Sequence, residues 1–550
     1  MSKYSPFRFI ISSCPPERAE SEMTSQRPSK VLSRALVATL CLTFAASARA
    51  SEESWQEAMD AGTKAFKEQK FPKALECFTR ALKDSDSFHG NSDSKAKSLN
   101  DLALVYDQMG RRDKARELYQ KSLDIKRKAH GNDDQDLIPT LNNLASSYME
   151  DEKFDDAEKS LLEANRIIEK SGKDDPRLCI NLNRLSAIYR SREDYDRAEK
   201  TLLQSLETAK KVFGEGNPAI AVIQNNLAVV KRLQNKPAEA ESLYKSSLQI
   251  RESASGKDDL GVAGSLNNLA RSYREQGKFD EAEPLLERSL KIVDSDQSAT
   301  PEQKIAAIKN LALVYREMGE PAKAEPLYSR ALSMQTETFG EGNESLIDTL
   351  SDQGSMFQEL EKYSDAVTSF EKALAICKTV GASADDMKVK VLSRLEDCYR
   401  QDNNLDRAIE INQEGRTLIE KQESPDQKLL SDKLNDLAML YKQKEDFANS
   451  EKYLKEAMSV IEKAYGRDSK ENSIFMNNLA RLYSENDMPD KAADLYKSVI
   501  DIRSKVFGAR SLPVAAAMRN YASVLRDLNQ NDDAKKMNGE AASIEKEVQQ

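Results

Sequence analysis

The chain has 550 residues, a formal net charge of −10 and an isoelectric point of about 5.3. This acidic balance argues against general electrostatic binding to nucleic acid or to an anionic membrane surface. No stretch of the sequence reaches the roughly 20 apolar residues that a membrane-spanning helix needs, which argues against an integral membrane protein.

The first 50 residues have the pattern of a secretory signal peptide. A basic stretch precedes an apolar run over residues 35–46, and an A-x-A cleavage motif follows and ends at Ala50. The apolar run is too short to serve as a permanent membrane anchor. We therefore expect cleavage after Ala50, with Met23 as an alternative start, and export of residues 51–550 to the periplasm or the extracellular space.

From the end of this region almost to the C-terminus, one pattern recurs about every 42 residues. Its clearest copies are the segments 141–145, 266–270 and 476–480, which share the order apolar-Asn-Asn-Leu-Ala. A small residue occupies the last position of nearly every copy: Gly62, Ala103, Ala145, Ser186, Ala228, Ala270, Ala312, Gly354, Ala438, Ala480 and Ala522. A period of this length is typical of a solenoid.

The unit over residues 139–171 predicts two amphipathic helices. Leu141, Leu144 and Tyr148 follow helical spacing, a polar break comes next, and a second apolar series runs over residues 154–168. In other units a proline opens the second helix, where it removes no helical hydrogen bond: Pro237, Pro321 and Pro489. Glycine-rich polar loops separate the units and act as helix stops. Each unit therefore predicts a helical hairpin, and no segment has the pattern of a strand.

Two motifs carry a resemblance to a known family. The first helix reads Leu-Asn-Asn-Leu-Ala-x-x-Tyr over residues 141–148, and the second reads Ala-Glu-x-Leu-Tyr over residues 240–244 and 324–328. These motifs resemble the tetratricopeptide repeat (TPR), in its longer, kinesin-light-chain-like form. The resemblance covers about 490 residues and implies an all-α, right-handed superhelical solenoid of about twelve helical hairpins over residues 51–550.

The units around residues 350–420 depart most from the pattern. Gln353 replaces an apolar residue, Glu396 occupies the small-residue position, and Gly415 interrupts a helix. A glutamate at a packed helix crossing must be paired or tilted outward, so we expect looser packing there. Either a hinge with a change of superhelical pitch or ordinary drift in a long array would explain these departures. The first unit, with Trp55 and Gly62, and the last unit, with its polar run over residues 532–543, are predicted to be end caps.

Catalytic motifs are absent from the sequence. It has two histidines and no zinc-protease motif, phosphate-binding loop or serine-nucleophile elbow. Cys77, Cys179, Cys377 and Cys398 follow no metal-binding spacing. The last two are either buried free thiols or, after export, a disulfide. We therefore predict a protein that is not an enzyme and that uses no metal and no cofactor.

By the resemblance to TPR arrays, the first helices line a concave groove in which partner peptides bind. A first row of asparagines is expected to face this groove, where amides can bond both N–H and C=O groups of a peptide: Asn100, Asn142, Asn183, Asn225, Asn267, Asn435 and Asn477. A second row, one residue later, is expected to bond the backbone of the neighbouring helix: Asn143, Asn226, Asn268, Asn310, Asn478 and Asn520.

A basic stripe lies at one position of the first helices. Its members are Arg190, Arg232, Arg274, Arg316, Arg400, Lys442 and Arg526, with Arg271 and Arg481 three residues before that position. Guanidinium groups suit carboxylates, so the stripe favours acidic peptide segments. The other interpretation is that these cations pair with neighbouring acids such as Glu275 and Glu317. The candidate peptide-binding residues are Asn142, Asn183, Asn225, Asn267, Arg190, Arg232, Arg271, Arg274 and Arg316.

These observations predict an exported, non-catalytic TPR scaffold that binds other proteins or peptides in its groove. Two alternatives remain open at this point. The array could associate with itself as a structural component of an envelope assembly, or it could be an intracellular adaptor if the N-terminus is retained. The sequence does not predict the oligomeric state.

Overall fold

The computed structural model describes residues 52–86, 92–172 and 174–548, and every regular element in these ranges is a helix. The all-α prediction is therefore confirmed. None of these helices is both long enough and apolar enough to cross a membrane. The predicted signal peptide lies outside the described residues.

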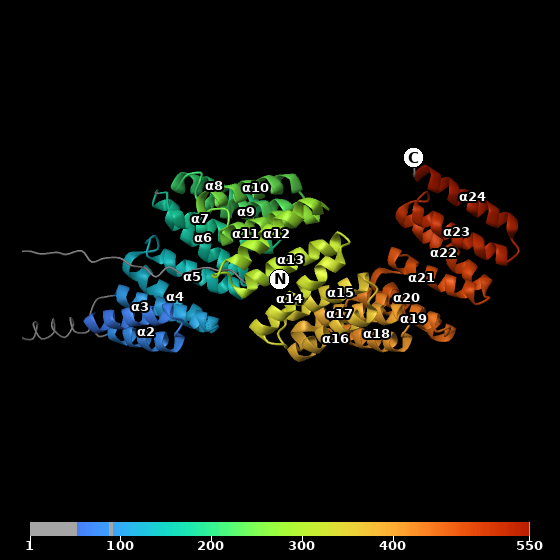
Figure 1. The fold of residues 1–550 in the computed structure, drawn as a ribbon, viewed down its shortest axis with the longest axis horizontal. Coiled ribbons are helices and arrows are strands. Elements are labelled where there is room, and N and C mark those ends of the chain that lie inside the picture. Colours follow the sequence, from blue (N-terminus) through green and yellow to red (C-terminus); the bar gives the residue numbers. More distant parts are fainter. Residues whose placement is uncertain (1–51, 87–91, 173, 549–550) are drawn as a thin grey trace, which may run out of the picture. The chain divides into compact units, whose positions relative to one another are not determined.

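The chain divides into two compact units, with the division between Gln276 and Gly277. In the first unit a helix over residues 52–67 precedes α2–α11 (Figure 1, blue to green). These helices are α2 (Phe71–Ser85), α3 (Ser92–Gln108), α4 (Arg112–His130), α5 (Leu137–Glu150), α6 (Phe154–Lys170), α7 (Pro176–Ser191), α8 (Tyr195–Phe213), α9 (Pro218–Leu233), α10 (Pro237–Ser255) and α11 (Leu260–Glu275).

The second unit continues the same pattern (Figure 1, yellow-green to red). Its helices are α12 (Phe279–Ser295), α13 (Pro301–Glu317), α14 (Pro321–Phe339), α15 (Ser345–Glu359), α16 (Tyr363–Val380), the short 3₁₀ helix η1 (Ala382–Ala384), α17 (Asp385–Gln401), α18 (Leu405–Glu420), α19 (Gln427–Gln443), α20 (Phe447–Tyr465), α21 (Lys470–Glu485), α22 (Pro489–Phe507), α23 (Leu512–Asp527) and α24 (Asn531–Val548).

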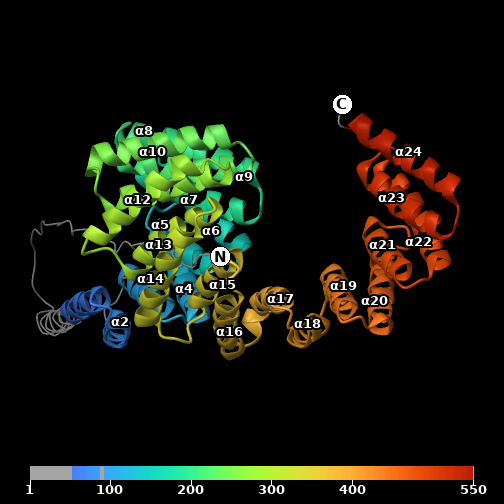
Figure 2. The ribbon, with the colours of Figure 1, turned by 45° about the vertical axis from the view of Figure 1, so that its right-hand side comes forward.

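Within each unit every helix packs on the next one in the chain, and the repeated pairing is visible along α16–α24 in Figure 2. The odd-numbered helices α3–α23 are the first helices of the predicted hairpins, and the even-numbered helices α4–α24 are the second helices. The helical-hairpin prediction is therefore confirmed.

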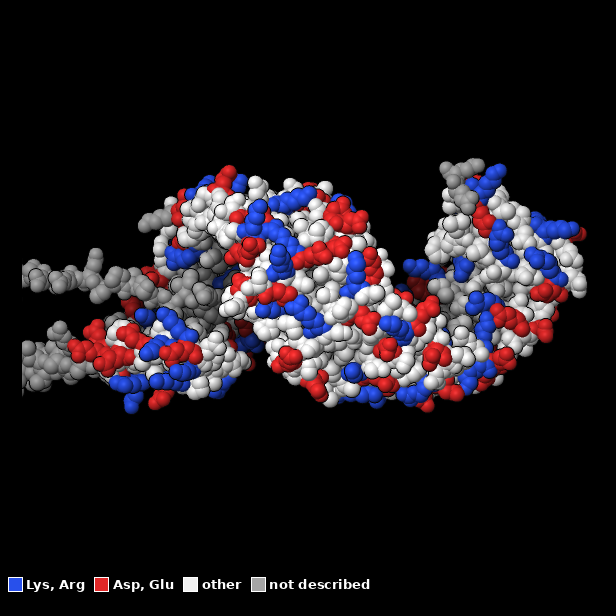
Figure 3. Space-filling model, in the orientation of Figure 1, with Lys and Arg blue, Asp and Glu red and all other residues white. Residues whose placement is uncertain are grey.

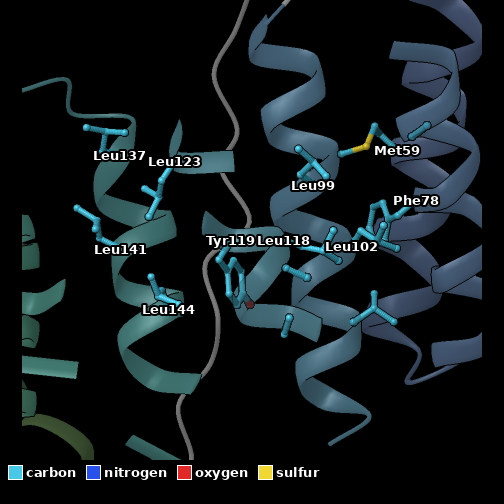
Figure 4. Close-up of a cluster of buried hydrophobic side chains, with 14 of the residues drawn as sticks. Met59, Phe78, Leu99, Leu102, Leu118, Tyr119, Leu123, Leu137, Leu141 and Leu144 are labelled. Atoms are coloured by element: carbon cyan, nitrogen blue, oxygen red, sulfur yellow. The ribbon is translucent and has the colours of Figure 1, made fainter. Parts of the chain in front are cut away.

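Clusters of buried apolar side chains lie between the helices of each unit. One cluster of the first unit contains Phe78 of α2, Leu102 of α3, Tyr119 of α4 and Leu141 of α5, each no more than 5% exposed (Figure 4). Burying a side chain of this size stabilises the fold by about 1.5–3 kcal/mol. Each hairpin contributes apolar side chains to both neighbours, so its core is completed by the adjacent hairpins.

The small-residue position lies where the two helices of a hairpin cross. A β-carbon on Gly62 would come within 2.7 Å of the Phe78 ring, and one on Gly354 within 2.7 Å of the Phe370 ring. In other units an alanine and a leucine or tyrosine occupy these two positions, as Ala145 and Leu161 do in one buried cluster of the first unit. The residue at this crossing is therefore matched in size to the residue sixteen positions later.

The helix ends agree with the sequence signals. Pro237, Pro321 and Pro489 each open a second helix, as predicted. The turn inside each hairpin contains one residue in the left-handed backbone region, with φ of +57° at Glu361 and +59° at Glu445. Glycine takes this conformation at lower cost than other residues.

Glu396 is paired rather than tilted outward. Its carboxylate lies 2.6 Å from Nζ of Lys433 and accepts a hydrogen bond of 3.0 Å from Nδ2 of Asn412. The neighbouring Leu392 and Leu395 are fully buried, so the structure does not show the looser packing expected here. Glu396, Asn412 and Lys433 therefore form a buried polar contact between α17, α18 and α19 instead of a gap.

Candidate peptide-binding surface

In the first unit successive first helices contact each other, α3 with α5, α7 with α9, and α9 with α11. Residues spaced three, seven and ten positions apart share one side of a helix. We call the exposed side of α7 and α9 the first-helix face, formed by Ile180, Asn183, Ala187 and Arg190 on α7 and by Val222, Asn225, Val229 and Arg232 on α9. The face therefore carries apolar side chains, a row of amides (Asn183 and Asn225) and a row of cations (Arg190 and Arg232).

The two rows of asparagines bond to each other across hairpins. Nδ2 of five of the six second-row residues donates to Oδ1 of the first-row residue 43 positions earlier. The distances are 3.4 Å for Asn143 to Asn100, 3.3 Å for Asn226 to Asn183, 2.9 Å for Asn268 to Asn225, 2.8 Å for Asn478 to Asn435 and 3.3 Å for Asn520 to Asn477. The expectation that the second row bonds helix backbone is therefore wrong for these residues. They form an asparagine ladder that fixes the register of consecutive hairpins.

The ladder changes what the first row can offer a ligand. Oδ1 of Asn183 and Oδ1 of Asn225 already accept a ladder bond. The Nδ2 group of each residue is therefore its remaining strong hydrogen-bonding group, and it donates. The first-helix face is consequently suited to carbonyl and carboxylate oxygens rather than to both groups of a peptide bond.

Asn142 and Asn267 differ from these two. The Oδ1 atom of each is buried and has no hydrogen bond within the described residues. Arg184 stands at the second-row position after Asn142, and its Nη1 donates to the backbone oxygen of Asn142 over 3.3 Å. An arginine at this position therefore replaces the ladder bond with a contact to the backbone.

Three cations of the basic stripe pair with a carboxylate 43 residues later in the chain, near the end of the next first helix. Nη1 of Arg232 lies 2.6 Å from Glu275, Nε of Arg316 lies 3.4 Å from Glu359, and Nζ of Lys442 lies 2.5 Å from Glu485. The side chains of Arg232 and Arg316 are each only 18% exposed. These three cations hold neighbouring hairpins together, which supports the structural interpretation for them.

The other predicted arginines lie in different environments. Arg271 is exposed and shares Glu275 with Arg232, with its Nε 3.2 Å from the carboxylate. Arg274 is half-buried and interacts with neighbouring residues. Arg316 belongs to the second unit, where it also approaches Asp352. The structure thus brings Arg190, Arg232 and Arg271 together in the first unit but does not join Arg316 to them.

Arg190 lacks the acid that the other cations have. The position 43 residues later is Leu233, and the Arg190 side chain makes no hydrogen bond or ion pair with any described residue. Burial and the neighbouring positive charge of Arg232 both lower the pKa of the Arg190 guanidinium. The pKa of Arg232 is lowered by burial but raised more strongly by the hydrogen bond and charge of Glu275. Arg190 therefore lies in a positive local field without a counter-ion.

Sequence reasoning selected the stripe but missed its pairing pattern. It compared each arginine with the acid that follows directly, whereas the contacts join residues 43 positions apart, one period plus one residue. That offset is readable from the sequence once consecutive first helices are aligned. Figure 3 agrees with extensive pairing, because blue and red side chains are interspersed over the visible surface.

The described residues hold no group of three or more His, Cys, Asp or Glu side chains placed to bind a metal ion. Cys377 and Cys398 are buried free thiols in the structure. Burial raises the pKa of the Cys398 thiol to about 12, which disfavours the reactive thiolate at neutral pH.

The tetratricopeptide repeat family profile matches residues 56–128, 136–211, 177–253, 219–295, 304–379, 429–505 and 476–547. The chain belongs to the tetratricopeptide repeat family. Arrays of this family present extended surfaces for protein–protein interaction and are generally non-catalytic.

Several solved structures are similar over part of the chain. The nearly identical TPR-like repeats of a putative kinesin light chain from Podosopora anserina are 21% identical over 38% of this chain and 100% of that one, with a TM-score of 0.35. BtubC (BKLC) from P. vanneervenii is 21% identical over 53% and 93%, with a TM-score of 0.29. The apo form of RapI is 17% identical over 52% and 98%, with a TM-score of 0.37. No curated protein sequence matches the chain.

Proposed function

We propose that this TPR protein is a non-catalytic scaffold that binds segments of partner proteins on its first-helix face. The observation that carries the proposal is the composition of that face on α7 and α9. Ile180 is 40% exposed and Val222 is 41% exposed, next to the Nδ2 donors of Asn183 and Asn225. Apolar contacts beside fixed donors suit an extended peptide, because side chains and backbone oxygens can both be satisfied.

A protein partner fits the charge of the chain better than a nucleic acid does. The formal net charge is −10, and the cations of the face lie among carboxylates such as Glu275. Binding to a phosphate backbone requires several cations that are free to release counter-ions. The face offers too few of these cations, so we propose that peptides are the ligands.

The test compares two matched pairs of substitutions in the full chain. Ile180→Glu with Val222→Glu places charge on the first-helix face. Leu162→Glu with Leu203→Glu places the same charge on second helices α6 and α8, where these leucines are 48% and 47% exposed. In capture from native extract, the first pair should lose partners that the second pair retains. The reverse result would place binding on the second helices, and recovery of the chain alone would favour self-association.

We further propose that the protein acts after export, as the basic, apolar and A-x-A segments before Ser51 suggest. The protein isolated from its native source should then begin at Ser51, as determined by intact mass and N-terminal sequencing. A retained N-terminus at Met1 or Met23 would contradict export and favour an intracellular adaptor.

A further inference from the structure

Exposed apolar side chains end the last three second helices of the second unit. The helices α20, α22 and α24 end at Tyr465, Phe507 and Val548, whose side chains are 52%, 46% and 50% exposed. Leu512, the first residue of α23, is also 50% exposed. Five of the eight earlier second helices α4–α18 end in a polar residue instead: His130, Lys170, Ser255, Ser295 and Glu420.

Two ion pairs bring these three helix ends together. The loop after α20 reaches the end of α22, where Asp468 lies 4.0 Å from Nζ of Lys505. The loop after α22 reaches the end of α24 through an ion pair between Arg510 and Glu547. We call this side of the second unit the C-terminal edge, and define it as residues 462–470, 504–512 and 545–548.

The charge of the C-terminal edge is opposite in sign to that of the chain. The edge carries six Lys or Arg and four Asp or Glu, whereas the formal net charge of the chain is −10. Two of the four acids are neutralised by arginines, because Glu547 pairs with Arg510 and Glu545 with Arg519. The edge therefore has a positive balance next to its apolar side chains.

Several of these cations are available to a ligand. The side chains of Lys463, Arg467 and Lys546 are exposed and make no ion pair with any described residue. A lysine lies in the last turn of each of the three second helices, as Lys505 does in α22. These lysines offset the negative end of each helix dipole, which would otherwise repel an anion.

We propose that the C-terminal edge binds the surface of an anionic lipid bilayer. Tyr465, Phe507 and Val548 enter the interfacial region, where aromatic and apolar side chains are stabilised, and the lysines lie among the lipid phosphates. The acidic chain as a whole does not prevent this contact, because charges more than about 10 Å from the bilayer are largely screened by salt. The proposal does not depend on the first-helix face.

The charge of the edge favours a bilayer over a second copy of the chain. In a symmetric pairing of two copies the same patch lies on both sides of the interface, so the unpaired cations would face one another. An anionic bilayer offers these cations a surface of opposite charge instead. The apolar side chains also end helices in a row, one hairpin apart, which suits a broad surface.

The first test reports from the edge itself. Phe507→Trp places an indole at the C-terminal edge, and Phe213→Trp places one at the same repeat position of α8. Phe213 is 39% exposed, but the second helices on either side of it end in Lys170 and Ser255. Trp55 is buried and contributes the same background to both variants.

The probe is a set of vesicles made of phosphatidylcholine alone or of an equimolar mixture with phosphatidylglycerol. With the anionic vesicles, the fluorescence of full-length Phe507→Trp should shift to the blue and be quenched by brominated acyl chains. Phe213→Trp should show neither change. Quenching from both positions, or from neither, would overturn the inference.

The second test measures binding by vesicle flotation. Phe507→Glu should weaken binding of the full chain to anionic vesicles by about tenfold or more, because it removes an inserted ring and adds a repelled charge. Phe213→Glu is the matched control and should bind as the wild type does. Residues 1–50 are present in every variant, so any binding by them is common to all and cancels in the comparison.

Other results would refute the proposal. Equal weakening by Phe507→Glu and Phe213→Glu would show that the C-terminal edge has no special role. Equal binding of Phe507→Trp to neutral and anionic vesicles would remove the contribution of the cations. A concentration-dependent mass without vesicles, abolished by Phe507→Glu, would assign the edge to pairing between two copies of the chain.

Discussion

At the scale of single residues, the buried contact of Glu396 with Lys433 replaces the small, apolar helix crossing of most other units. Their side chains are only 6% and 4% exposed and lie 2.6 Å apart. Taking both charges out of water is costly, and the pair is tolerated because each charge compensates the other and Asn412 adds a hydrogen bond. Replacing only one of the two charged residues should therefore lower the free energy of unfolding by more than the complete pair adds to it.

We predict that Lys433→Met lowers the free energy of unfolding by about 3–5 kcal/mol, because Glu396 is left buried without a counter-ion. The triple variant Lys433→Met, Glu396→Ala, Asn412→Leu should recover most of this loss, since it recreates the alanine–leucine crossing of Ala145 and Leu161. Urea denaturation of the full chain measures both. A loss below about 1 kcal/mol for the single variant would show that the pair is not buried in solution.

A second residue-scale prediction concerns Asp107, whose burial raises the pKa of its carboxyl group to about 6. The folded state therefore binds the proton more tightly than the unfolded state does. The stability that this proton contributes is complete below pH 4 and is lost as the pH rises through about 6. Asp107→Asn should be more stable than the wild type by about 1–3 kcal/mol at pH 7 and equal to it near pH 4.

Thermal or urea unfolding at several pH values tests this sign. Asp133→Asn serves as the control, because hydrogen bonds from Lys170 and Arg166 lower the pKa of the exposed Asp133 carboxyl. Its effect should run in the opposite direction, because the wild type is favoured above about pH 4 and loses this advantage as the pH falls through the lowered pKa of Asp133. An Asp107→Asn difference that does not change with pH would refute the assignment.

At the scale of helices and turns, most of the fold could be predicted from the sequence. The 42-residue period and the Leu141 and Phe154 apolar series are local signals, and they indicated the hairpins and their order. The asparagine ladder and the Arg232–Glu275 pair could not be predicted in the same way. They depend on how one hairpin is rotated against the next, which joins residues 43 positions apart rather than one period apart.

The turns inside the hairpins offer a prediction at this scale. Glu361 and Glu445 hold φ values of +57° and +59°, where Gly319 has +76° at the equivalent position of another hairpin. Glu361→Gly and Glu445→Gly should each raise the free energy of unfolding by about 0.5–1 kcal/mol, because the left-handed strain is relieved. Gly319→Ala should lower it by about 1 kcal/mol. Destabilisation by both glycine substitutions would show that these turns are unstrained.

At the scale of the whole molecule, the chain is a TPR array whose candidate site could be predicted only in part. The first-row asparagines and the basic stripe were recognisable because they repeat. The difference between Arg190 and Arg232 could not be predicted from the repeat, because both occupy the same position in it. The residue 43 positions after Arg232 is Glu275, whereas the residue 43 positions after Arg190 is Leu233.

The central claim is that partners bind the first-helix face, and site-specific photo-crosslinking tests it most directly. A photoreactive amino acid is placed at Val222 on that face or at Leu203 on a second helix of the same unit, and the full chain is irradiated in native extract. We predict a crosslinked partner protein from position 222 and none from position 203. A partner that crosslinks only from position 203, or a crosslink from position 222 only to a second copy of the chain, would contradict the account.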